Sequence, residues 1–118
     1  MIYNILHYNF ILELYNNNNL KHLSTQLNKA FDSRVRLGFM SILIANNEVD
    51  FSRMKELLDL TDGNLASHVT ALEKLEYIAV RKQFVGRKPQ TTYILMPAGR
   101  AAFAAHLDAL EALIKDNK

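Results

Sequence analysis

The stretch TDGNLASHVTALEKLEYI, residues 61–78, has the pattern of a short helix with two different faces. On a helical wheel of about 100° per residue, one side carries the apolar residues Leu65, Val69, Leu72 and Leu75. The other side carries mostly short polar side chains: Gly63, Asn64, Ser67, Thr70 and Lys74. A helix that only covers a core usually has long charged residues facing solvent, because these favour helicity and solubility. The short side chains therefore predict a surface that a partner approaches closely.

The residues before this helix predict a compact helical domain. Residues 20–31 have apolar residues at helical spacing, and RVRLGFMSILIAN (34–46) follows Asp32 and Ser33, which are good N-caps, so that it should form the buried central helix. A short extended piece is expected around Val49. RMKELLDL (53–60) should then form a short helix with Ser52 as its N-cap, and DLTDG ends it in a tight turn.

The residues after it predict a hairpin and a final helix. YIAVRKQF (77–84) and TTYILM (91–96) are rich in β-branched and aromatic residues, and VGRKPQ (85–90) between them contains glycine and proline, as turns do. Pro97 is tolerated in the first turn of a helix, so a long helix is expected from there to the end of the chain. The predicted fold class is mainly α with a small β-hairpin.

Charge is distributed unevenly along the chain. At 118 residues the sequence has room for one domain, and its apolar content of 49% and charged content of 22% are ordinary for a globular protein. Residues 81–100 contain five basic side chains and no acidic one, so they carry +5 although the whole chain carries only +2. A local basic surface of this kind is typical of proteins that bind a polyanion.

Residues 1–19 form a separate arm. The arm lacks the basic start and cleavage site of a signal peptide, and polar residues interrupt an apolar run that is too short to span a membrane. It is either a short amphipathic helix packed on a partner, with Leu6 and Phe10 on its apolar side, or a poorly ordered extension. With no cysteine in the chain, we expect a cytoplasmic protein without membrane contact.

The order of a short helix, a tight turn, a second helix and a hairpin with a basic tip resembles a winged helix-turn-helix domain. LDLTDGNLASHVTALEKLEYI and GRKPQTTYIL carry the resemblance, which extends over roughly residues 27–115, to the small MarR-like and ArsR-like transcriptional regulators of prokaryotes. One departure is Glu76, which stands where these proteins usually have glycine before the strand. The expected organisation is an arm (1–19), a DNA-binding domain (20–96) and a C-terminal dimerisation helix (97–118).

The resemblance implies a homodimeric, sequence-specific regulator that binds double-stranded DNA. The helix at about 62–75 would enter the major groove, and the wing at 85–90 would reach the backbone or the minor groove. Neighbours on a strand point opposite ways, so that only one of Arg81 and Lys82 can face DNA. His68 is either a boundary residue with one ring nitrogen satisfied or a DNA contact. The predicted DNA-binding set is Gly63, Asn64, Ser67, His68, Thr70, Lys74, Arg81, Arg87 and Lys88.

The final helix has an apolar seam at Phe103, Leu107, Leu110 and Ile114, which is either core or dimer interface. With Leu6 and Phe10 these residues form the predicted dimer interface. An alternative reading is a winged-helix module that binds protein and not DNA. Whether the protein binds a small-molecule effector is left open, since no residue marks a site for one.

Neither metal binding nor catalysis is indicated. The four histidines are scattered without chelating spacing, and no cysteine is available to complete a metal site. Phosphate-binding loops, nucleophile elbows and paired buried carboxylates are absent from the sequence, so no catalytic residue, metal or cofactor is predicted.

Overall fold

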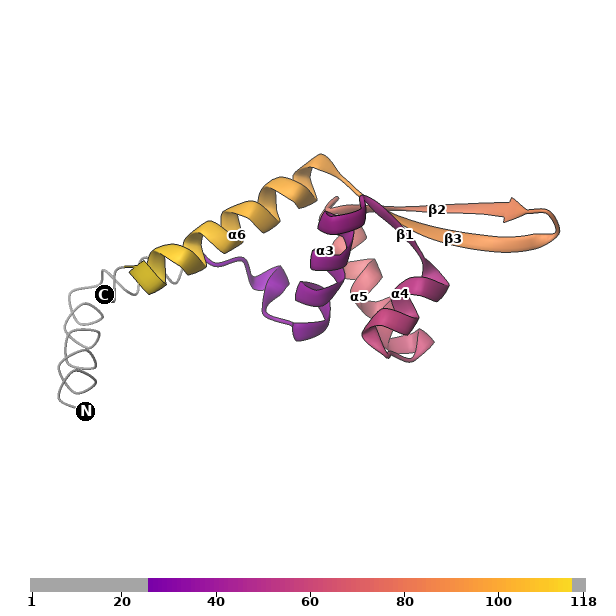
Figure 1. The fold of residues 1–118 in the computed structure, drawn as a ribbon, viewed down its shortest axis with the longest axis horizontal. Coiled ribbons are helices and arrows are strands. Elements are labelled where there is room, and N and C mark those ends of the chain that lie inside the picture. Colours follow the sequence, from indigo (N-terminus) through magenta and orange to yellow (C-terminus); the bar gives the residue numbers. More distant parts are fainter. Residues whose placement is uncertain (1–25, 116–118) are drawn as a thin grey trace. The chain divides into compact units, whose positions relative to one another are not determined.

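The computed structural model describes residues 26–115, and Figure 1 shows the arrangement of their helices and strands. In chain order the elements are η1 (Lys29–Phe31, a short 3-10 helix), α3 (Arg34–Asn46), β1 (Glu48–Asp50), α4 (Phe51–Leu58), α5 (Asp62–Lys74), β2 (Ile78–Val85), β3 (Lys88–Leu95) and α6 (Pro97–Lys115). The predicted winged helix-turn-helix fold is confirmed. The chain divides into two compact units, residues 29–103 and, among the described residues, 26–28 with 104–115.

Helix α3 is the centre of the first unit. Ser33 caps it, because its hydroxyl oxygen accepts a hydrogen bond from the Arg36 N–H at 3.3 Å. Its side chains Phe39, Met40 and Leu43 are fully buried, as the apolar run of the sequence predicted. They pack in one core with residues of α4, α5, the sheet and the start of α6, namely Met54, Leu65, Leu72, Ile78, Tyr93 and Phe103.

The sheet has three antiparallel strands in the order β1-β3-β2. β3 pairs with β2 along its whole length, from Ile78 opposite Leu95 to Val85 opposite Lys88, whereas β1 pairs only with residues 92–94 of β3. The predicted turn at 85–90 is therefore too long, since only Gly86 and Arg87 lie between the strands. Pro89 is tolerated in a strand here because, within residues 26–115, no strand pairs with the other edge of β3 at that position.

Helices α4 and α5 form the helix-turn-helix. The N-cap of α4 is Asp50 and not Ser52 as predicted, because the Asp50 carboxylate accepts from the Arg53 N–H at 2.8 Å, so that α4 starts at Phe51. Asp59 ends α4 in the left-handed conformation, with φ of 51°. Thr61 then caps α5 by accepting from the Asn64 N–H at 3.3 Å. The predicted turn and second helix are confirmed.

The end of α5 shows why glycine is usual at the position that Glu76 occupies. Glu76 has φ of 63°, its N–H donates to Glu73, and the Tyr77 N–H donates to Leu72. This pair of bonds is a Schellman motif, which normally has glycine at the left-handed position because a Cβ there costs about 1–2 kcal/mol. The helix ends before Leu75, which is 46% exposed, and so its predicted place in the core is wrong.

Two further predictions concern the ends of the chain. The helix expected over residues 20–31 is wrong in its described part, where residues 26–28 are not helical and η1 is a single short turn; residues 20–25 lie outside the described residues. The arm at 1–19, with Leu6 and Phe10, also lies outside them. None of the helices in residues 26–115 is long and apolar enough to cross a membrane.

Candidate nucleic-acid interface

The exposed face of α5 is a strip of short side chains. Leu65, Val69 and Leu72 hold the helix against the core from its other face. The strip comprises Gly63, Asn64, Ser67, Thr70 and Lys74, and all five residues are exposed. They recur at three- and four-residue spacing, so the strip follows the helix for roughly 16 Å at about 1.5 Å per residue. The structure thus brings together the predicted residues of this helix and leaves their face uncovered.

The two hydroxyl groups of the strip are already bonded to their own helix. Ser67 Oγ donates to the Asn64 carbonyl at 3.0 Å, and Thr70 Oγ1 donates to the Ala66 carbonyl at 2.9 Å. A hydroxyl that donates its hydrogen inward keeps both oxygen lone pairs and can present them outward as acceptors. In this state the centre of the strip offers acceptors, which suit the exocyclic amino groups of adenine and cytosine in the major groove.

His68 lies at the edge of the strip and is half-buried. Arg36 Nε of α3 donates to His68 Nδ1 at 3.0 Å, so the ring is neutral and carries its proton on Nε2. Burial lowers the pKa of His68 below its usual 6.5, and the nearby Arg36 charge lowers it further. Of the two alternatives for this residue, the structure supports the boundary histidine with one ring nitrogen satisfied.

The His68 contact predicts a pH dependence of stability. A histidine whose pKa is lowered on folding binds its proton more readily when unfolded, so the stability that it contributes is complete above about pH 6.5 and is lost as the pH falls through the lower folded value. The midpoint of urea unfolding of the wild type should therefore move to a lower urea concentration when the pH is lowered from 7 to 5. His68→Gln, whose side-chain oxygen can still accept from Arg36 but does not titrate, should show a smaller shift. Equal shifts in both proteins would exclude His68 as the source.

The β2–β3 hairpin supplies the positive charge beside α5. Lys82 lines a hollow of about 370 Å³ together with Thr70 and Glu73 of α5 and Thr91 of β3. Arg81 points to the opposite face of the hairpin, where its guanidinium pairs with Glu48 at 3.2 Å. Of the two, Lys82 and not the predicted Arg81 therefore lies on the face of the hairpin beside α5, and its contact with DNA stays a prediction. The sequence predicted that Arg81 and Lys82 point to opposite faces of the hairpin, but which of them faces α5 depends on the register of β2 with β3.

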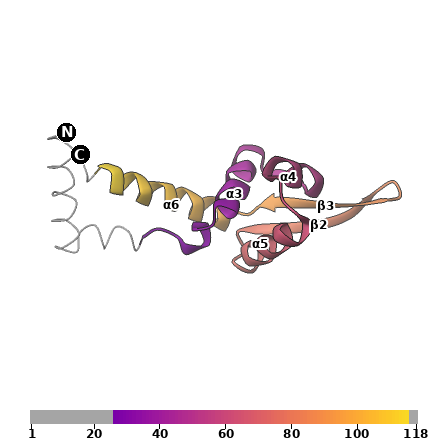
Figure 2. The ribbon, with the colours of Figure 1, turned by 90° about the horizontal axis from the view of Figure 1, so that it is seen from below.

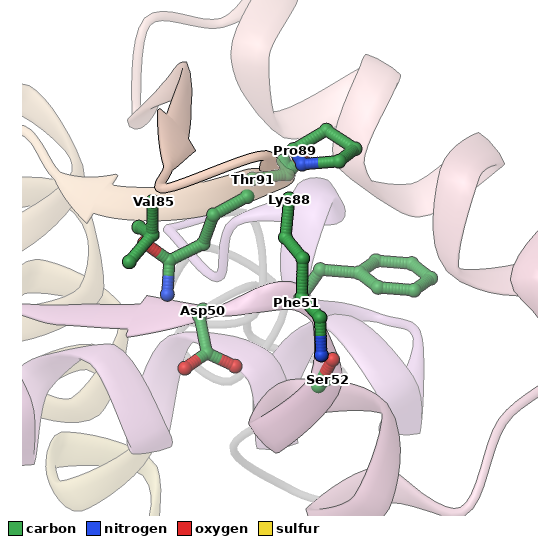
Figure 3. A pocket seen from close by; sticks show the side chains of 8 residues that line it. Asp50, Phe51, Ser52, Val85, Lys88, Pro89 and Thr91 are labelled. Carbon is green, nitrogen blue, oxygen red and sulfur yellow. The ribbon is translucent and has the colours of Figure 1, made fainter.

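The tip of the hairpin presents Arg87 on a tight turn. Gly86 has φ of 64° and Arg87 has negative φ, the pattern of a type II′ turn, which requires glycine at its first central position. Arg87 is exposed at the end of this turn. Figure 3 shows the side chain of Lys88 extending toward Ser52 at the start of α4, within a hollow of about 440 Å³. Lys88 thus lies beside the helix-turn-helix, whereas Arg87 stands at the extreme of the hairpin.

The predicted interface seam on α6 divides between the two units. Phe103 is buried in the core of the first unit, where its ring meets Phe31 edge-on with centroids 5.5 Å apart, so its predicted place in the dimer interface is corrected to the core. Leu107, Leu110 and Ile114 belong to the second unit and are each more than 40% exposed. Within that unit, the buried His106 accepts a hydrogen bond from the Asn28 N–H at 3.0 Å.

Arg100 and the potential metal ligands add nothing to this surface. Arg100 donates to the Asn47 side-chain oxygen at 2.6 Å, so its guanidinium pairs within the chain. No group of three histidines, aspartates or glutamates that could hold a metal ion occurs within the described residues 26–115.

A family of known sequences matches most of this chain. Residues 35–114, from the start of α3 almost to the end of α6, match the winged helix DNA-binding domain. The chain belongs to this family. The family and its fold are those of transcriptional regulators and not of enzymes. A curated relative, an uncharacterized protein of Methanocaldococcus jannaschii, is 31% identical over 88 residues, which cover 75% of this chain and 96% of the relative.

Solved structures show the same winged-helix architecture. A transcriptional regulator homologue from Pyrococcus horikoshii superposes with a TM-score of 0.72 at 30% identity, over 81% of this chain and 93% of the homologue. A MarR-like regulator from Thermotoga maritima gives 0.55 at 20% identity, over 88% and 77% of the two chains. Overoxidized AbfR bound to DNA gives 0.64 at 17% identity, over 91% and 79%. The predicted resemblance to winged-helix transcriptional regulators is thereby confirmed, and the likeness to the MarR-like protein shows that the two share this fold.

Proposed function

We propose that this winged-helix protein is a sequence-specific regulator that binds double-stranded DNA as a homodimer. The observation that carries the proposal is the uncovered strip of short side chains on α5 beside a hairpin rich in positive charge. The DNA-bound structure of AbfR, which has the same fold, supports the choice of nucleic acid as partner.

The dimensions of α5 suit the major groove of B-DNA. A helix with ordinary side chains is about 10–12 Å across, and the groove is about 12 Å wide and 8.5 Å deep. Short residues at 63, 64, 67 and 70 let the helix backbone approach the bases, and Asn64 can pair with adenine through its amide. Lys74, at the last position of α5, is placed for a phosphate.

The hairpin would contact the backbone next to this groove. Residues 77–107 contain no acidic side chain, so nothing within this segment repels a phosphate. Lys82 would face the phosphates of the DNA strand beside α5. Arg87 would enter the adjacent minor groove, whose negative potential attracts arginine where the groove is narrow.

The dimer is proposed from the exposed apolar residues of α6. Leu107, Leu110 and Ile114 recur at three- and four-residue spacing, so they share one side of the helix. A second copy that covers this side would remove it from water and give the protein a two-fold axis. Two α5 helices related by such an axis would read half-sites about one helical turn, roughly 34 Å, apart.

A titration against random-sequence duplex DNA at 50, 100 and 200 mM salt tests the proposal. Arg87→Ala should weaken binding to every duplex and reduce the slope of log affinity against log salt by about one per protomer, because one phosphate contact is lost. The slope counts cations that displace counterions from DNA, whether they lie in the minor groove or on a phosphate. Arg34→Ala removes the same charge from the exposed start of α3 and should leave the slope unchanged, so it serves as the matched control. An unchanged slope for Arg87→Ala would overturn the assignment of the hairpin.

The wild-type titration separates DNA binding from the alternative function. A protein-binding module should show little affinity for duplex DNA and little salt dependence, in which case the proposed function itself fails. Asn64→Ala provides a further distinction, because losing a base contact should reduce the preference for selected sites while leaving binding to random duplex nearly unchanged.

A further inference from the structure

The outer part of the β2–β3 hairpin carries an exposed aromatic ring that the proposed contacts do not use. Phe84 is 74% exposed, the highest fraction among the large apolar side chains of the described chain. It pairs across the hairpin with Pro89, so that the two apolar residues lie side by side next to the turn. A large apolar group held in water near the end of a protruding segment commonly marks a contact surface.

The register of the hairpin places Phe84 on the side that faces α5. Side chains alternate along a strand, and the pairing of β2 with β3 continues without interruption from Ile78 to Val85. Phe84 therefore shares a face with Lys82 and Val80, both of which line the hollow beside α5. Val85, the next residue, is 57% exposed on the opposite face.

The hairpin projects as a two-stranded arm. β1 pairs with β3 no further out than Thr92, so among the described strands β2 and β3 pair only with each other beyond that point. The arm reaches past α4 and α5 in both Figure 1 and Figure 2. Its outer part consequently combines the Phe84–Pro89 pair with the charge of Arg87 at the turn and that of Lys82 on the same face.

We propose that Phe84 is an apolar contact for the sugar edges that line the DNA minor groove, an inference that rests on the proposed function. The minor groove is about 6 Å wide, and the two strands alone are about 4.8 Å apart, so only side chains of the tip can enter. The groove has apolar deoxyribose walls between rows of phosphates. An apolar ring flanked by cations matches that combination of surfaces, and Phe is among the residues that proteins place in the minor groove.

The contact is tested by separating charge-dependent from charge-independent affinity. Phe84→Ala should lower affinity for duplex DNA about tenfold, or about 1.4 kcal/mol, by the same factor at 50, 100 and 200 mM salt, because the ring carries no charge and releases no counterions. Val85→Ala is the matched control on the other face and should stay within about twofold of wild type. Circular dichroism spectra identical to wild type should accompany both, since each side chain is exposed.

Several outcomes would overturn the inference while leaving the proposed function intact. Wild-type affinity for Phe84→Ala would show that the ring makes no contact with DNA. An equal loss of affinity in Val85→Ala would show that the contact is not specific to the face of the hairpin that carries Phe84. A salt slope reduced as in Arg87→Ala would mean that the variant had disturbed the charged tip. Self-association reduced by Phe84→Ala in sedimentation without DNA would assign the ring to a second copy. Absence of DNA binding by the wild type would instead remove the proposed function and the inference with it.

Discussion

Ser67→Glu should lower affinity for duplex DNA by about 100-fold or more, which corresponds to about 2.8 kcal/mol. Ser67 stands in the middle of the exposed strip on α5, at the point that the proposed function brings closest to the bases. Glutamate there adds a longer side chain that holds the helix away from the groove. It also adds a negative charge beside phosphates, and like charges brought together at an interface cost several kcal/mol.

The control for this change is Ser41→Glu. Ser41 is also exposed, and its hydroxyl donates to the carbonyl of Leu37 four residues earlier at 2.8 Å, so the chemical change closely matches that at Ser67. Fluorescence anisotropy with a labelled duplex should show near wild-type affinity for Ser41→Glu. Binding by Ser67→Glu within about threefold of the control would exclude α5 as the reading helix, even if the protein bound DNA by another surface.

Gly99→Ala should destabilise the fold by about 3 kcal/mol or more, because an alanine Cβ at this buried position would lie 2.1 Å from the Tyr77 carbonyl oxygen. That oxygen also accepts the Met96 N–H at 3.1 Å, so it cannot move aside without loss of a hydrogen bond. The backbones of residue 77 and of the first turn of α6 would have to separate. For a domain of this size the melting temperature should fall by roughly 12 °C or more.

Gly63→Ala provides the comparison for Gly99→Ala. A Cβ at Gly63 would meet no atom within 4 Å, and alanine is the better helix former, so thermal unfolding should be unchanged or slightly raised. A small effect of Gly99→Ala in the same calorimetric measurement would mean that the first turn of α6 moves freely away from Tyr77. The two alanine variants thus separate a glycine required by packing from one on the candidate DNA surface.

The local sequence was sufficient to predict helix α5 and the β2–β3 hairpin. The turn before α5, the buried positions Leu65, Val69 and Leu72 and the glycine in the hairpin turn each depend on neighbours within a few residues, and their predictions were correct. Two predictions failed on exact limits, since Asp50 rather than Ser52 caps α4 and Leu75 falls just past the end of α5. Competing caps one or two residues apart differ too little in sequence to be separated.

The sequence by itself determined the order of elements, the strip of short side chains on α5 and the concentration of positive charge after residue 80, because periodicity and composition are properties of the chain. Only the tertiary structure decided that Lys82 and Phe84 face α5 while Arg81 pairs with Glu48, and that Phe103 belongs to the core. Those outcomes follow from strand register and helix packing, which join residues far apart in the chain. A shift of the register by one residue would exchange the two faces of the hairpin.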